Sequence, residues 1–379
     1  MKQTALGRFF RPALPHALAA AVLLGACSPQ VNTPKLDTGA VDAEAKIQRE
    51  LVVRSSAELM DRMYRVAWNI RAKNVDLCGD RVSQALGFTL LSLDDYKKAE
   101  QREAVKSVLS VHSRPTVYLI GPGGPADVAG LKRGDAIMSV DGENTETKKS
   151  ARELLAAALK AGRPAVVEVK SDNVVSTHTI TPMRICGYPV RLDRSTEINA
   201  FADGDTIILC MGMLKFVKSD DELAAVLGHE MAHNTQKHNR NKSVNAAVGQ
   251  LLVDLPIRLL LGVNTTVGQR MGRQMFSPQY ETEADYVGLY YTARAGYDIH
   301  NVADVWRRMS VEYPEAITLV TTHPSNSQRF VGLTADAAEI DKKRAEGLPL
   351  VPEMKDGPAT VGAPAQTEAE EDPLPPAEN

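Results

Sequence analysis

The feature that most constrains this chain of 379 residues is an H-E-x-x-H segment at residues 229–233, inside a stretch with helical spacing. Residues four apart on an α-helix lie one turn above each other, so His229 and His233 present two imidazoles to one point, with Glu230 beside them. This arrangement predicts a zinc site, because two nitrogen ligands leave room for a third protein ligand and a water. Zinc lowers the pKa of that water to about 7, so Glu230 is the candidate base for amide hydrolysis.

The residues ahead of this segment support a helix that starts at about Asp220. Ser219 and Glu222 form a predicted capping box, and the acidic residues between them suit the positive end of the helix dipole. The alternative is that the two histidines are packed or solvated residues of a surface helix. We expect the metal site, with one zinc ion per chain.

The third metal ligand is not supplied by the next turn of the same helix. In the pattern H-E-x-x-H-x-x-G-x-x-H, the glycine and the last histidine fall on Gln236 and Asn239 in this chain. His238 is one residue out of register and is interpreted as a helix-surface residue. A ligand from a second helix is therefore expected.

A second helical pattern at residues 280–289 supplies the candidate ligand. Glu281 and Asp285 share one face of that helix at i and i+4, whereas Glu283 points elsewhere. We predict that Glu281 is the third metal ligand. Asp285 is the predicted acceptor that fixes the tautomer of a ligand histidine.

These two segments, H-E-x-x-H followed by E-x-x-A-D, resemble the gluzincin family that includes the CaaX prenyl protease and the heat-shock protease HtpX. The resemblance extends over roughly residues 186–335 and implies a zinc metalloendopeptidase. It places His323 and Arg329 beside the zinc, where they would stabilise an oxyanion or hold the site shut; the alternative for His323 is a turn residue before Pro324. It also implies that substrate pairs with an edge strand at Asn199, Ala200 and Phe201.

A second unit precedes the zinc motif. A strand at 117–120, a Gly-Pro turn, and then Ala-Gly-Leu, Gly-Asp and Val-Asp-Gly follow one another between residues 117 and 142. This order is similar to that of PDZ domains, over roughly residues 84–184. The resemblance implies that a C-terminal peptide or an internal strand binds along the sheet edge, with Leu86, Gly87 and Phe88 as the carboxylate-binding loop. The alternative is a PDZ fold kept as a spacer with an occluded groove.

The expected fold class is α+β. A mostly helical zincin-like domain with a small edge hairpin, its turn at Asp203-Gly204, carries the chemistry, and a β-rich PDZ-like domain is inserted after an N-terminal helix. The expected boundaries are a signal peptide at 1–26, a tether at 27–40, a helical segment at 41–83 that packs on the catalytic domain, the PDZ-like domain at 84–184, the metallopeptidase domain at 185–347 and a disordered tail at 348–379.

The first residues indicate export. Basic residues precede a short apolar run that ends at Leu24-Gly25-Ala26-Cys27, which resembles a lipobox and implies lipidation of Cys27. Ser28 after it resembles lipoproteins of the outer membrane, so a periplasmic, lipid-anchored protein is expected. In an oxidising compartment Cys78 and Cys186 are predicted to form a disulfide. The alternatives are a plain signal peptide with a chance cysteine, and cysteines that stay free.

Charge excludes one class of partner. The formal net charge is −3 and there is no basic block, so a nucleic-acid partner is not expected. We expect hydrolysis of unfolded or misassembled cell-envelope proteins in protein quality control, with the PDZ-like domain recognising substrate or partner. The alternative is a PDZ-bearing envelope chaperone or scaffold lipoprotein whose zinc site is closed or structural.

Overall fold

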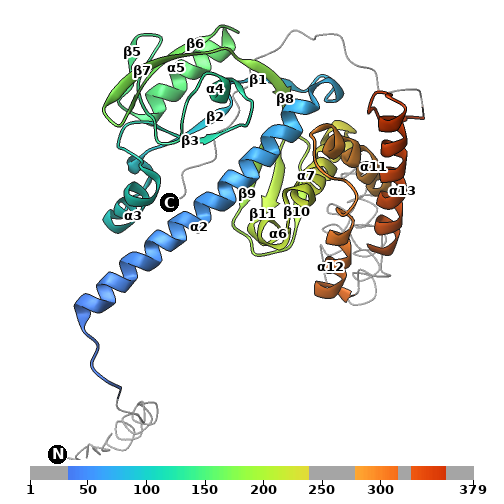
Figure 1. Ribbon diagram of the computed structural model, residues 1–379, viewed down its shortest axis with the longest axis horizontal. Helices are drawn as coiled ribbons and strands as arrows, with labels where there is room; N and C mark the ends of the chain where they lie inside the picture. The colour runs from blue at the N-terminus through green and yellow to red at the C-terminus, as the bar shows by residue number, and fades with distance from the viewer. Residues whose placement is uncertain (1–32, 239–277, 315–325, 356–379) are drawn as a thin grey trace, which may run out of the picture. The chain divides into compact units, whose positions relative to one another are not determined.

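The computed structural model describes residues 33–238, 278–314 and 326–355 (Figure 1). The predictions for the signal peptide, for Cys27 and for His323 concern residues outside these ranges. In the described ranges, no helix combines the length and the apolar character that a membrane crossing requires. The chain divides into residues 1–48 and a compact unit formed by residues 49–379, which holds all the elements discussed below apart from the first turns of α2.

The N-terminal helical segment is one long helix, α2 (Thr38–Lys73), whose second half is buried. It is followed by the short helix η1 (Val75–Leu77) and by β1 (Val82–Ala85), which pairs antiparallel with β8 (Met183–Cys186). The chain thus enters an inserted domain after β1 and returns from it through β8. A disulfide joins Cys78 to Cys186 beside this strand pair, and the free Cys210 is buried.

The inserted domain is built on a sheet in the order β2-β3-β4-β6-β7, with β5 paired to β4. Its apolar core lies between this sheet and α5, which Figure 1 shows across one face. The expected strands and the helix near Lys148 are confirmed. The elements are β2 (Phe88–Leu91), η2 (Leu93–Asp95), α3 (Ala99–Leu109), β3 (Thr116–Ile120), α4 (Pro125–Val128), β4 (Ala136–Val140), β5 (Glu143–Asn144), α5 (Lys148–Lys160), β6 (Ala165–Ser171) and β7 (Val174–Ile180).

The remaining unit combines a small sheet with helices. β10 and β11 form the expected antiparallel hairpin, and β11 pairs in parallel with β9, so β10 is an edge strand of this sheet. Ser219 caps α7 by accepting from the Glu222 backbone N–H, whereas the Glu222 carboxylate accepts from Lys218 N–H. The elements are β9 (Val190–Asp193), β10 (Ala200–Ala202), β11 (Ile207–Cys210), α6 (Met211–Phe216), α7 (Asp220–Thr235), α11 (Pro278–Arg294), α12 (Asp304–Glu312) and α13 (Asn326–Ala345).

The start of the tail differs from the expectation. Residues 348–355 were expected to be disordered, yet Leu350 and Met354 pack against the main core. Lys343 Nζ on α13 also donates to the Val351 carbonyl at 2.7 Å. The composition gave the wrong prediction here because two apolar side chains and three hydrogen bonds to the backbone, at Leu350, Val351 and Glu353, are enough to fix this short segment on α11 and α13. The rest of the tail lies outside the described residues.

The two central helices, α7 and α11, lie side by side (Figure 1). Their backbones approach each other where Gly228 on α7 lies against Gly288 on α11. A Cβ on Gly228 would come within 2.5 Å of the Gly288 carbonyl oxygen, and a Cβ on Gly288 within 2.6 Å of the His229 nitrogen. Both distances are shorter than the closest contacts that a Cβ atom makes with backbone atoms in proteins. The absence of side chains at these two positions therefore sets the closeness of the helices.

We predict that Gly288→Ala lowers the free energy of unfolding by about 1–3 kcal/mol, because the added methyl group must push two backbones apart. Gly332→Ala is the matched control, since it makes the same change within α13 where nothing lies within 4 Å of the new Cβ. That control should be neutral or stabilising by up to about 1 kcal/mol. Urea unfolding followed by circular dichroism measures both, and equal effects would contradict the assigned crossing.

α13 packs along α11 and brings acidic residues together. Tyr286 and Tyr290 hydroxyls donate to Glu339 Oε1 at 2.7 and 2.5 Å, one turn from Asp336. Burial, together with the negative charges of Asp285 and Glu339, raises the pKa of Asp336 to about 7. Ionised Asp336 is therefore destabilised in the folded protein.

We predict that Asp336→Asn stabilises the protein in a pH-dependent way. A carboxyl whose folded pKa lies above its unfolded value stabilises when protonated, and this contribution is lost as the pH rises through about 7. The variant should therefore exceed the parent in melting temperature most clearly at pH 8, with a smaller gap at pH 5. Asp341→Asn, at a side chain of the same helix that is 43% exposed, is the control. A gap that does not change with pH would contradict the raised pKa.

Candidate metal centre

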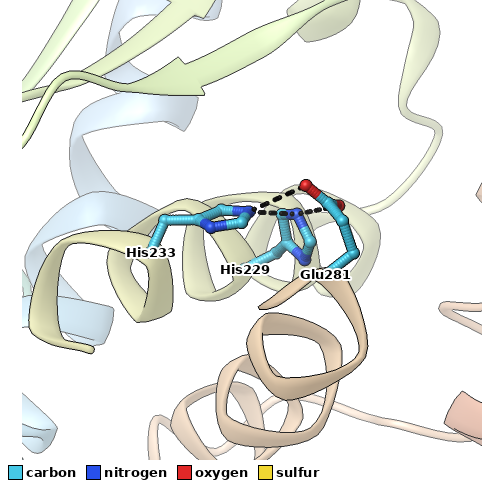
Figure 2. A group of neighbouring side chains, drawn as sticks. All are labelled: His229, His233 and Glu281. Carbon is cyan, nitrogen blue, oxygen red and sulfur yellow. Dashed lines mark hydrogen bonds and ion pairs between the residues drawn. The ribbon is translucent and has the colours of Figure 1, made fainter. Parts of the chain in front are cut away.

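Three side chains converge between α7 and α11. Figure 2 shows His229 and His233 from consecutive turns of α7 facing Glu281 from the first turn of α11. The ligand atoms of these three residues all lie within 4.8 Å of one another, and the side chains are 0–5% exposed. The structure therefore brings together the three residues that the sequence proposed as metal ligands.

The spacing of these atoms suits a metal ion. The two histidine Nε2 atoms are 3.1 Å apart, and each lies 3.5 Å from an oxygen of Glu281. Ligand atoms about 2.0–2.1 Å from a tetrahedral zinc lie roughly 3.3–3.4 Å from one another. Two imidazole nitrogens and one carboxylate group at this spacing fit such an ion, with one coordination position left for another group.

The Nδ1 atom of His229 contacts Asp285, which forms an ion pair with Arg329. Asp285 Oδ1 accepts from His229 Nδ1 at 2.9 Å, and the Arg329 guanidinium donates to Asp285 Oδ2 at 2.8 Å. Arg329, on α13, also lies 3.6 Å from the centre of the Trp306 ring. Arg329 Nη2 also lies 3.1 Å from His229 Nδ1 and 3.4 Å from His229 Nε2, so Arg329 contacts this histidine directly as well as through Asp285.

Charge at this buried site favours a cation. Burial and Arg329 both oppose protonation of His229, but Asp285 and Glu281 outweigh them and raise its pKa to about 9. Burial likewise opposes ionisation of Asp285, yet Arg329 and His229 hold the pKa of Asp285 below its usual range. Asp285 thus remains charged, and a positive charge beside it is stabilised.

The Nδ1 atom of His233 has a different partner, the imidazole of His238. The interpretation of His238 as a helix-surface residue is wrong, since it is only 2% exposed. Its Nδ1 lies 2.9 Å from His233 Nδ1, and its Nε2 lies 3.2 Å from Glu283 Oε2. Burial lowers the pKa of His238 despite the opposing charge of Glu283. The helical pattern concealed this contact because the chain turns after Thr235 and brings His238 inward.

The other residues singled out in the sequence lie as follows. Glu230 is 4% exposed, and its negative charge is one of those that raise the pKa of Arg329. Ala200 and Phe201 lie on the edge strand β10, which contacts α7, with Asn199 directly before it. Phe201 is 42% exposed on this edge. His323 lies outside the described residues, so its relation to the site stays a prediction.

The edge of the inserted sheet borders a cavity of about 320 Å³. Leu86, Gly87 and Phe88 line it together with β2, α5 and the buried half of α2. Arg71 and Arg152 are also among the lining residues, which include no acidic side chain. Leu86 and Gly87 directly precede β2, which begins at Phe88, and their role as a carboxylate-binding loop stays a prediction. The sequence did not indicate that α2 forms one wall of this cavity.

Known proteins match two regions of the chain. Residues 182–337 match the model of Peptidase family M48, and residues 116–167 match that of the PDZ domain. The mitochondrial metalloendopeptidase OMA1 of Schizosaccharomyces pombe is 31% identical over 164 residues, which cover 41% of this chain and 49% of the relative. The putative beta-barrel assembly-enhancing protease of Vibrio cholerae is 32% identical over 154 residues, covering 36% of this chain and 32% of the relative.

Two further matches cover less. The beta-barrel assembly-enhancing protease of Escherichia coli K12 is 31% identical over 123 residues, 28% of this chain and 25% of the relative. A solved structure, the HtrA3 PDZ domain bound to a phage-derived ligand, covers 28% of this chain at 20% identity and a TM-score of 0.23, a likeness too low to support a conclusion. The chain spans about half or less of the length of these curated relatives. The chain is thus similar to Peptidase family M48 over residues 182–337 and to the PDZ domain over residues 116–167.

Proposed function

We propose that the protein is a zinc-dependent metalloendopeptidase. The observation that carries the proposal is the spacing of 3.1–3.5 Å between two imidazole nitrogens and a carboxylate, at a buried point beside Glu230. A purely structural zinc site has four protein ligands and no use for an adjacent carboxylate base. The names of the relatives, metalloendopeptidase and protease, agree with this chemistry.

The roles of the residues follow from their positions. Zinc, when bound by His229, His233 and Glu281, supplies Lewis acidity that polarises a carbonyl and acidifies water. Glu230, next to His229 in the same helix, accepts the proton of the attacking water and returns it to the leaving amine. Asp285 and Arg329 keep His229 in the orientation and tautomer that a metal ligand needs.

The substrate side of the proposal rests on β10. Within the described ranges this edge strand pairs with a single strand, β11, so one of its two sides is not covered by a second strand. We infer that a substrate segment adds to this edge at Asn199, Ala200 and Phe201, next to α7. A family role for His323 beside the zinc belongs to the same proposal.

The location and the substrates are proposed from the sequence and from the relatives. The signal-like start with a lipobox at Cys27 supports a periplasmic lipoprotein of the outer membrane, and the Cys78–Cys186 disulfide suits an oxidising compartment. Two relatives are named for beta-barrel assembly. We therefore propose unfolded or misassembled envelope proteins as substrates, selected or presented by the PDZ domain.

We predict that Glu230→Gln lowers the cleavage rate of an unfolded reporter such as casein by about 100-fold or more, because amide oxygen cannot serve as the base. Zinc content, measured by atomic absorption, should stay near one per chain. Glu312→Gln, at an exposed residue of α12, is the matched control and should cleave like the parent. Unchanged cleavage by Glu230→Gln, or no metal-dependent cleavage by the parent, would contradict the proposed activity.

We predict that Cys27→Ser releases the protein from the membrane fraction of a Gram-negative host. Without the thiol no lipid is attached, so membrane binding that depends on the lipid is lost. Incorporation of a labelled fatty acid and fractionation of the envelope measure the effect. Labelling that persists in Cys27→Ser would rule out this cysteine as the anchor.

A further inference from the structure

The residue of interest is His238, which follows the end of α7. The helix ends at Thr235, and Lys237 has a positive φ of 57°, a left-handed conformation that reverses the chain direction. This turn brings the His238 ring against α11, where it stacks on Tyr280 with ring centres 4.5 Å apart. The imidazole is thus fixed by packing next to the metal site.

The hydrogen bonds around His238 define one consistent arrangement of protons. His233 uses Nε2 toward the other ligands, so its Nδ1 carries the proton and donates to His238 Nδ1 at 2.9 Å. His238 then accepts at Nδ1, which requires that its own proton is on Nε2. That nitrogen donates to Glu283 Oε2 at 3.2 Å. A chain of two hydrogen bonds therefore leads from a carboxylate, through one neutral imidazole, to a metal ligand.

We propose that His238 is a positioning residue for the metal ligand His233, oriented in turn by Glu283. The inference rests on the proposed function in that the site must hold a metal. Donation to His238 keeps the His233 ring from rotating and keeps its Nε2 unprotonated, as coordination requires. Asp285 provides the same support for His229 directly, so each histidine ligand has its own partner.

The test measures zinc affinity by competition with a chromophoric chelator. His238→Phe keeps a ring that can stack on Tyr280 but accepts no hydrogen bond, so the zinc dissociation constant should rise about 10–100-fold. His238→Asn keeps an acceptor near the position of Nδ1 and should regain part of the affinity. Glu283→Gln, at a side chain that is 37% exposed, should weaken zinc binding less than His238→Phe does. The Co²⁺-substituted forms should show shifted visible absorption bands in the same order.

His300→Phe is the matched control, because it makes the same change at a side chain that is 55% exposed. It should bind zinc like the parent. Melting of the metal-free proteins checks folding separately. A dissociation constant for His238→Phe within about twofold of the parent overturns the proposal; if that variant does not fold, unchanged affinity in Glu283→Gln overturns it. Zinc binding is measured without proteolysis, so a parent that binds zinc but cleaves nothing would refute the peptidase activity and not this role of His238.

Discussion

The metal site depends on the close approach of α7 and α11 at Gly228 and Gly288. His229 directly follows the first of these glycines, and Glu281 precedes the second by two helical turns. With backbones in contact at the crossing, a short carboxylate side chain reaches the imidazoles of the neighbouring helix. Side chains at the crossing would separate the helices and move Glu281 away from the histidines. The helix packing is thus part of the site itself.

Electrostatics make this packing costly unless a cation is present. Glu281, Asp285 and Glu230 are all buried within a small region, and Arg329 is the buried arginine that faces them. Three buried carboxylates close to one arginine repel one another, so a further positive charge between them stabilises the site. The raised pKa of His229, about 9, expresses the same requirement, since a proton then occupies a site suited to a metal ion. Metal binding and stability of this region are therefore linked.

Local spacing predicted much of the site, and long-range contacts account for what it did not predict. The positions of His229 and His233 follow from helical geometry alone, and the i, i+4 relation of Glu281 and Asp285 put both on the face that meets α7. His238 was misplaced because the left-handed conformation of Lys237 ends the helix without a glycine to signal it. The contact of Trp306 with Arg329 joins residues on separate helices, and no periodicity within either helix indicates it.

The long helix α2 contacts both the start of α7 and the cavity beside the inserted sheet. Arg62 donates to Asp220 Oδ1 at 2.8 Å and to the Val217 carbonyl at 3.1 Å, so it fixes the start of the helix that bears the metal ligands. Met60, Met63 and Tyr64, within the same turn or so, line the cavity beside the PDZ-like sheet. The same turns of α2 therefore contact both the cavity beside the inserted sheet and the start of α7, nine residues before His229. A change that displaced α2 from either contact would also act on the other, because an α-helix is stiff over one or two turns.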